Sequence, residues 1–325
     1  MTSGGGNPES AGASAYVTAQ DGLRLHVREY GPRIAPAMPV VCLPGLARTV
    51  ADFDALAPTL ANGYPPRRVI AIDSRGRGRS DYDINPENYN MAVELGDIVT
   101  VLTALEIGKA VFIGSSRGGL LTMLLGVAHP TAIGGAVLHD IGPVIEPRGL
   151  ARIKSYVGKL AQPRSFEEGA EILRRLFDVQ FPKLTAEQWL AAAYRTWKRD
   201  GGNLAPTYDI RLARTLAELD IERPLPSMWN EFDALSHVPI LVIRGANSDI
   251  LSAAAVTAMR ARHPEMETIE IPDQGHVPSL DNPDLISRIS EFIAACDGHA
   301  KPSAAERGGR DADYVKGPAV LVTRH

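Results

Sequence analysis

Short apolar runs rich in β-branched residues alternate with helical patterns along most of this chain, and this alternation constrains the fold more than any other feature. Uninterrupted apolar runs of this length are typical of strands covered on both faces. The alternation therefore predicts an α/β fold with a mostly parallel, doubly wound sheet. The predicted buried strands are Pro39–Leu43, Arg68–Asp73, Ala110–Gly114, Gly134–His139, Ile240–Arg244 and Glu267–Ile271, and the predicted helices are Asp52–Ala61, Asn90–Leu105, Gly118–Ala128, Ala253–Arg262 and Pro283–Ala295.

The regions outside this alternation set the expected domain organisation. Asp21-Gly22 lies between the apolar runs Tyr16–Ala19 and Leu23–Tyr30, which predicts an opening antiparallel hairpin. Both ends of the chain are rich in small and polar residues, as disordered segments are, although the last stretch contains an apolar piece, Ala319–Val322, that could pair with a sheet edge or a partner. The predicted division is a disordered segment 1–14, a core formed by 15–145 and 237–297, an inserted segment 146–236, and a flexible tail 298–325.

The inserted segment 146–236 has helical patterns, three tryptophans and no clear strand. It leaves the core after the predicted strand Gly134–His139, and ligands of such sheets bind at the carboxyl ends of the strands. We therefore expect a helical cap over the site, with apolar side chains such as Leu173, Trp189 and Trp197 lining a pocket. The alternative is a packing decoration whose aromatic residues fill a small core of their own.

Composition excludes several classes of function. The formal net charge of this 325-residue chain is −4, without the basic stripe that nucleic-acid binding requires. The first residues lack the basic and apolar regions of a signal peptide, and no apolar run is long enough to span a membrane. Cys42 and Cys296 lie in apolar runs and are expected to be buried thiols. The expected protein is cytoplasmic, contacts neither membrane nor nucleic acid, and uses no metal or cofactor.

The segment Gly114-Ser115-Ser116-Arg117-Gly118 lies between a predicted strand and a predicted helix. In that context the pattern G-x-S-x-G is typical of a sharp turn that projects the middle serine as a nucleophile. Glycines on either side allow close packing, and the first turn of the helix offers free N–H groups to a developing oxyanion. We therefore predict that Ser116 is the nucleophile.

A serine nucleophile needs a base, and a histidine base needs a carboxylate that orients it. His276 follows the last predicted strand, after a glycine that permits a tight turn, and is the predicted base. His139, at the end of an earlier strand, is its rival. Asp249 is the predicted acid, although it also precedes a helix as an N-cap would. Asp140 is the alternative acid.

Several segments together resemble the α/β-hydrolase family over about residues 15–297. Beyond the serine turn they are Leu43-Pro44-Gly45-Leu46, Asp73-Ser74-Arg75-Gly76-Arg77-Gly78-Arg79-Ser80, Gly245-Ala246-Asn247-Ser248-Asp249 and Gln274-Gly275-His276. The chain order serine, acid, histidine is also that of the family. The resemblance implies an oxyanion hole formed by the backbone N–H groups of Leu46 and Arg117. Pro44 departs from the family pattern, which has histidine there.

The side chain of Arg117 has two interpretations. A buried arginine needs a paired carboxylate, for which the candidates are Asp140, Glu94 and Asp97. The other interpretation is recognition of a substrate carboxylate together with Arg48, which would make the substrate acidic.

The expected function is a serine hydrolase that cleaves a carboxylic ester or lactone of a small molecule through an acyl-enzyme. Amide or C–C bond hydrolysis by the same residues, and a non-catalytic receptor-like binding protein, are the alternatives that the residues leave open. The oligomeric state is not predicted.

Overall fold

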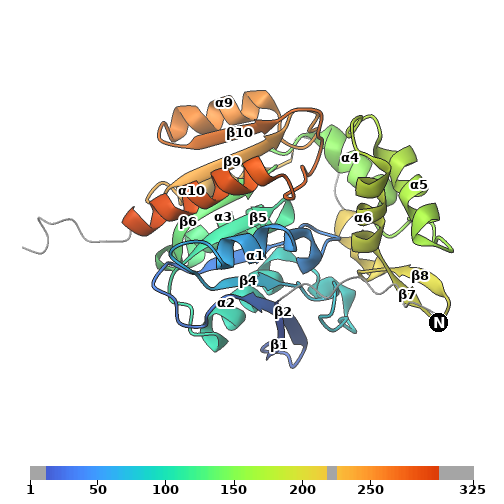
Figure 1. Cartoon of the computed structure of the whole chain (residues 1–325), viewed down its shortest axis with the longest axis horizontal. Coiled ribbons are helices and arrows are strands. Elements are labelled where there is room, and N and C mark those ends of the chain that lie inside the picture. The colour runs from blue at the N-terminus through green and yellow to red at the C-terminus, as the bar shows by residue number, and fades with distance from the viewer. Residues whose placement is uncertain (1–11, 218–224, 300–325) are drawn as a thin grey trace, which may run out of the picture.

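The computed structural model describes residues 12–217 and 225–299. Its centre is an eight-stranded sheet in the order β1-β2-β4-β3-β5-β6-β9-β10 (Figure 1). β1 and β2 form an antiparallel hairpin, β2 pairs antiparallel with β4, and every other pair is parallel. The strands are β1 (Ala13–Thr18), β2 (Arg24–Tyr30), β3 (Val40–Leu43), β4 (Val69–Ile72), β5 (Ala110–Ser115), β6 (Ile133–His139), β9 (Ile240–Gly245) and β10 (Glu267–Ile271).

Helices cover both faces of the sheet, as the doubly wound prediction requires. Side chains of α1 and α10 share one apolar cluster with the strands, and those of α2, α3 and α9 share a second cluster on the opposite face. The helices of this core are α1 (Leu56–Ala61), α2 (Met91–Ala104), α3 (Arg117–Ala128), α8 (Trp229–Asp233), α9 (Ala253–Arg262) and α10 (Pro283–His299), with short 3-10 turns at η1 (Val50–Phe53), η2 (Pro86–Asn88) and η3 (Pro130–Ala132). β3 and β4 are buried along their whole length, which explains their unbroken apolar sequences.

The segment predicted as a helical insertion, 146–236, contains a strand pair as well as helices. It contains α4 (Pro147–Tyr156), α5 (Phe166–Phe177), α6 (Ala186–Thr196), the strands β7 (Trp197–Asp200) and β8 (Asn203–Pro206), η4 (Ile210–Ala213) and α7 (Arg214–Ala217). The hairpin β7–β8 was not predicted, because four-residue strands separated by Gly201-Gly202 give little apolar periodicity. α8, inside the predicted limits 146–236, packs Phe232 into the core cluster with α3. We therefore use "insertion" for residues 147–217.

Figure 1 shows the insertion gathered on one side of the sheet, with α5 farther from the sheet than α6. Leu173, Trp189 and Trp197 are buried in a cluster of the insertion itself. The expectation that these three side chains line a pocket was therefore wrong. A different cluster, with Leu150 and Tyr208 of the insertion, packs against Leu46 of the core.

The ends of the chain lie largely outside the described residues. The predicted disordered segment 1–14 is too long by at least two residues, because β1 begins at Ala13. α10 continues past the predicted core limit of 297 to His299. The predicted apolar pairing segment, Ala319–Val322, and the rest of the predicted tail from 300 lie outside the described residues.

Candidate active site

Ser116 lies in the sharp turn between β5 and α3, with a backbone φ of 49° and ψ of −115°. A positive φ is rare for a residue with a side chain and indicates local strain. The flanking glycines explain how the turn fits. A Cβ on Gly114 would lie 2.5 Å from the backbone of Gly118, and a Cβ on Gly118 would lie 2.1 Å from the carbonyl oxygen of Leu43. Both glycines are therefore required by close packing, and the turn leaves Ser116 partly exposed.

His276 bridges Ser116 and an aspartate. Its Nε2 lies 2.8 Å from the Ser116 Oγ, and its Nδ1 lies 2.8 Å from an Oδ2 of Asp140. The structure therefore brings the predicted nucleophile and the predicted base together. The predicted acid Asp249 was wrong as the partner of His276, and the alternative, Asp140, occupies that position.

The sheet order explains why Asp140 is the partner. β6 lies between β5 and β9, so that Asp140, the first residue after β6, lies beside the turn that holds Ser116. Asp140 is fully buried, and its carboxylate also accepts hydrogen bonds from the Gly245 N–H at 2.8 Å and the Ser248 hydroxyl at 2.7 Å. Two donors other than His276 thus hold the carboxylate in the position from which it contacts the imidazole.

Asp249 instead anchors the insertion. Its carboxylate accepts two hydrogen bonds from Arg152 of α4, at 2.6 and 2.8 Å. Burial raises the pKa of Asp249, but Arg152, with smaller contributions from Gln180 and His276, more than offsets this effect, and the net pKa is below its ordinary value. α4 approaches so closely that a Cβ on Gly149 would lie 2.3 Å from the Asp249 carbonyl oxygen. The N-cap alternative also fails, because Ser252 caps α9.

His139, the rival base, is buried and turned away from the nucleophile. Its Nδ1 lies 2.5 Å from the hydroxyl of Ser115, the residue before Ser116. Burial lowers the pKa of His139 to about 4, with Asp140 opposing and His276 adding to this shift. His139 does not contact Ser116, and a group whose pKa is this low accepts a proton only weakly, so it does not fit the role of the base.

The two predicted oxyanion donors lie on either side of Ser116. Arg117 is the first residue of α3, where a backbone N–H has no partner within the helix. The N–H of Leu46 has no hydrogen-bond acceptor in residues 12–217 or 225–299. The Leu46 carbonyl accepts a 2.7 Å hydrogen bond from the Nε of Arg77. Arg77 thus supports the loop whose family histidine is replaced by Pro44, a role that the sequence did not reveal.

A buried ion network joins the loop of Leu46 to the first turn of α3. Glu94 accepts hydrogen bonds from Arg77 at 2.8 Å and from the Nε of Arg117 at 2.8 Å. Burial raises the pKa of Glu94, but the two guanidinium groups reverse this and hold the pKa below its ordinary value. Of the three carboxylates considered for Arg117, Glu94 is therefore its partner, and the side chain of Arg117 is occupied by a structural ion pair.

The insertion reaches the loop of His276 and the loop after β9. A Cβ on Gly275 would lie 2.6 Å from the Cβ of Gln180, which follows α5. The backbone carbonyl of Gln180 accepts a hydrogen bond from the Asn247 side chain at 3.1 Å, and Lys183 forms an ion pair with Asp273 at 2.6 Å. The insertion therefore covers the carboxyl ends of β9 and β10, beside His276.

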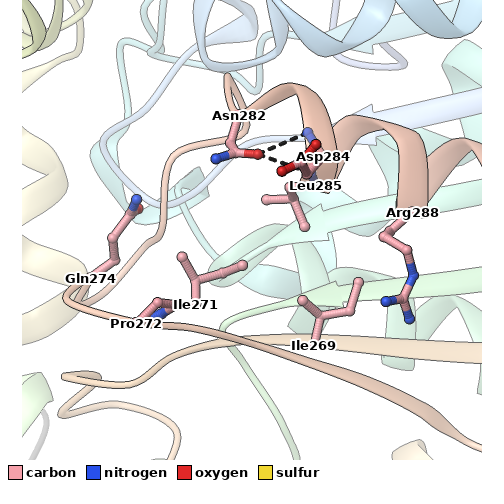
Figure 2. A pocket seen from close by; sticks show the side chains of 8 residues that line it. All are labelled: Ile269, Ile271, Pro272, Gln274, Asn282, Asp284, Leu285 and Arg288. Carbon is pink, nitrogen blue, oxygen red and sulfur yellow. Dashed lines mark hydrogen bonds between the residues drawn. The ribbon is translucent and has the colours of Figure 1, made fainter.

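A surface cavity of about 360 Å³ lies apart from these residues, between β10 and α10 (Figure 2). Figure 2 shows Ile269, Ile271 and Leu285 in its wall, while Asn282 accepts hydrogen bonds from the N–H groups of Asp284 and Leu285. Asn282, one of the polar residues of this wall, is thus engaged at the start of α10. Within the described part of the chain, no group of three or more potential ligands could hold a metal ion, and no helix has the length and apolarity to cross a membrane.

Comparison with known proteins agrees with this geometry. A model of the "Alpha/beta hydrolase family" matches residues 40–289. The chain is 33% identical over 277 residues to a 3-hydroxybutyrate-oligomer hydrolase of Cupriavidus necator, covering 83% of this chain and 92% of that protein. It is 26% identical over 275 residues to a 2-(acetamidomethylene)succinate hydrolase of Mesorhizobium japonicum, covering 84% and 92%.

A solved structure is similar over almost the whole described fold. An alpha/beta hydrolase from Novosphingobium aromaticivorans has a TM-score of 0.79 and 39% sequence identity, and the match covers 88% of this chain and 99% of that one. The family model spans most of the chain, and the fold class and resemblance predicted from the sequence are confirmed. This protein belongs to the α/β-hydrolase family.

Proposed function

We propose that this protein is a serine hydrolase that cleaves a carboxylic ester of a small molecule through an acyl-enzyme. The observation that carries the proposal is the continuous chain of contacts from Ser116 through His276 to Asp140, at 2.8 Å for each step. A serine in hydrogen-bond reach of an imidazole, itself held by a buried carboxylate, is the arrangement that activates a hydroxyl for attack on a carbonyl.

The reaction follows from this arrangement. His276 takes the Ser116 proton as Oγ attacks the ester carbonyl, and Asp140 stabilises the imidazolium that forms. The N–H groups of Leu46 and Arg117 stabilise the oxyanion. His276 then protonates the leaving alcohol. Water next attacks the acyl carbonyl as His276 takes its proton, and His276 returns that proton to the Ser116 Oγ as the acid leaves.

The relatives support an ester without settling it. The Cupriavidus necator relative is named for hydrolysis of 3-hydroxybutyrate oligomers, which are held together by ester bonds, and it matches nearly its full length. The Mesorhizobium japonicum relative is named as a hydrolase of an acetamido compound, so an amide substrate is the second candidate. The insertion would act as a cap that selects among such substrates, because it contacts Leu46 and the loop of His276.

The decisive experiment labels the purified protein with a fluorophosphonate and assays p-nitrophenyl butyrate, a small lactone and p-nitroacetanilide. We expect labelling and ester turnover in the wild type. Ser116→Ala should abolish the label and lower kcat by 10³-fold or more. Ser115→Ala is the matched control, since the neighbouring hydroxyl contacts His139 and not His276. Label retained by folded Ser116→Ala would refute the proposal, and anilide cleavage without ester cleavage would favour the amide.

A further inference from the structure

Two arginines and one aspartate meet where the loop of Leu46 faces the insertion. Arg48 lies two residues after Leu46, and Arg195 lies in the last turn of α6. Asp52 of η1 is the carboxylate that both approach. It accepts two hydrogen bonds from Arg48, one of them at 2.8 Å, and it lies 3.8 Å from the Nε of Arg195. We name Arg48, Asp52 and Arg195 the junction cluster.

Arg48 brings the junction cluster close to Ser116. The position that a Cβ on Gly45 would occupy is 3.2 Å from the Cγ of Arg48 and 3.6 Å from the Cβ of Ser116. On the other side, Asp52 is close enough to His139 for each group to shift the pKa of the other. A ligand whose carbonyl rests at Ser116 could therefore place a second group, a few bonds away, at this cluster.

The junction cluster contains two guanidinium groups and one carboxylate, and only Arg48 is hydrogen-bonded to that carboxylate. Arg48 uses Asp52 and also donates to the Thr196 hydroxyl at 3.3 Å. The guanidinium of Arg195 donates no hydrogen bond to any residue that the structure describes, although only 28% of its side chain is exposed. An arginine that is largely removed from water normally has a carboxylate partner with good geometry. Burial accordingly lowers the pKa of Arg195, since Asp52 offsets only part of the loss of hydration and Arg48 adds repulsion.

More distant acids do not complete the pairing. Asp281, after the His276 loop, and Asp54, after η1, favour the charge of Arg195 electrostatically, but neither lies within ion-pair distance of it. Asp281 is solvent-exposed, and Asp54 is paired with Arg28 at 2.6 Å. The donors of Arg195 thus remain available at the junction of insertion and core.

We propose that Arg195, with Arg48, binds a carboxylate of the substrate. This inference rests on the proposed function and names its substrate class: a small ester that carries a free carboxylate a few bonds from the scissile carbonyl. A guanidinium presents paired donors that match a carboxylate, and such charge-assisted pairs are among the stronger polar contacts. Because Arg195 belongs to the insertion and Arg48 to the core, a bound carboxylate would also join the two.

The test compares monoethyl glutarate with diethyl glutarate, which share the ester but differ in the free carboxylate. We expect the wild type to prefer the monoester in kcat/KM by tenfold or more, and Arg195→Gln to reduce that ratio at least tenfold. Arg195→Lys should keep part of the preference, which separates a charge effect from lost packing. Arg175→Gln on α5, with a side chain 78% exposed, is the matched control and should leave the ratio unchanged.

A binding measurement keeps this inference separate from the proposed function. In Ser116→Ala, monoethyl glutarate should raise the melting temperature more than diethyl glutarate at equal concentration, and Arg195→Gln in that background should remove the difference. Turnover of both esters with no preference for the monoester would overturn the carboxylate site and leave the hydrolase intact. Absence of all turnover would refute the hydrolase, and equal melting shifts would still refute the site.

Discussion

Replacing the two aspartates near His276 one at a time separates their roles. Asp140→Asn keeps the shape of the side chain but replaces an acceptor with an amide. The Asn oxygen can still accept from the Gly245 N–H, so that the amide nitrogen faces the imidazole. An amide donor there favours the His276 tautomer with the proton on Nε2, which cannot accept the proton of Ser116. We expect kcat/KM to fall by about 10⁴-fold, or about 5 kcal/mol of transition-state stabilisation.

Asp249→Asn should act on stability instead. It removes the charge of an ion pair whose side chains are only 19% and 15% exposed, and it leaves Arg152 with a neutral partner. Breaking such a partly buried pair costs about 2 kcal/mol of the free energy of unfolding. Turnover should fall by less than about tenfold, because His276 keeps its contact with Asp140.

The assay is the hydrolysis of p-nitrophenyl butyrate by both variants at pH 8, with the free energy of unfolding measured in urea for each. Circular dichroism spectra that match the wild type establish that each variant is folded. A loss of 10³-fold or more in Asp249→Asn, together with a loss of less than tenfold in Asp140→Asn, would refute the assignment and restore Asp249 as the acid.

Three further predictions concern charge. The pKa of His139 is about 4 in the folded protein and near 6.5 in the unfolded chain, so between pH 7 and pH 5 only the unfolded chain takes up a proton there. Lowering the pH from 7 to 5 should therefore reduce the free energy of unfolding of the wild type by about 2 kcal/mol more than that of His139→Gln, as urea titration at both pH values would measure. Arg117→Met should change kcat by less than about tenfold, because the backbone N–H remains and the lost side chain is paired with Glu94. A rise in KM confined to monoethyl glutarate would instead show that the side chain binds the substrate. The stability advantage of the wild type over Asp249→Asn should be complete well above about pH 4, where the unfolded carboxylate is charged, and should decrease as the pH falls toward the lowered folded pKa of Asp249, as thermal melts at pH 7 and pH 3 would show.

The sheet could be predicted from the sequence because its strands are buried on both faces. β3 and β4 are four-residue strands with no exposed position, and each carries an unbroken apolar sequence that is visible without the structure. The turn at Ser116 was equally visible, since its glycines are forced by contacts of 2.1 to 2.5 Å. The hairpin β7–β8 was not, because three of the four residues of β7 are exposed and give no apolar signal.

The choice between Asp140 and Asp249 depended on contacts that no local pattern reports. Both follow strands whose carboxyl ends lie at the same edge of the sheet, so that chain position permits either as the partner of His276. The deciding contact comes from Arg152, far away in the sequence, whose guanidinium binds the Asp249 carboxylate. Arg48 and Arg195 likewise approach the same carboxylate, Asp52, only because the end of α6 lies against Arg48, and no local sequence pattern reports that Arg195 joins them.

One loop after β9 serves both the candidate triad and the insertion. Gly245 and Ser248 donate hydrogen bonds to Asp140, and the next residue, Asp249, accepts those of Arg152 on α4. Ser248 and Asp249 are adjacent, so a shift of α4 that pulled on Asp249 would move the hydroxyl that fixes the Asp140 carboxylate. The loop therefore links the contacts of the insertion to those of the partner of His276 through adjacent residues. A ligand that draws the insertion toward the core would act on the base through covalent neighbours, without any contact of its own with Asp140.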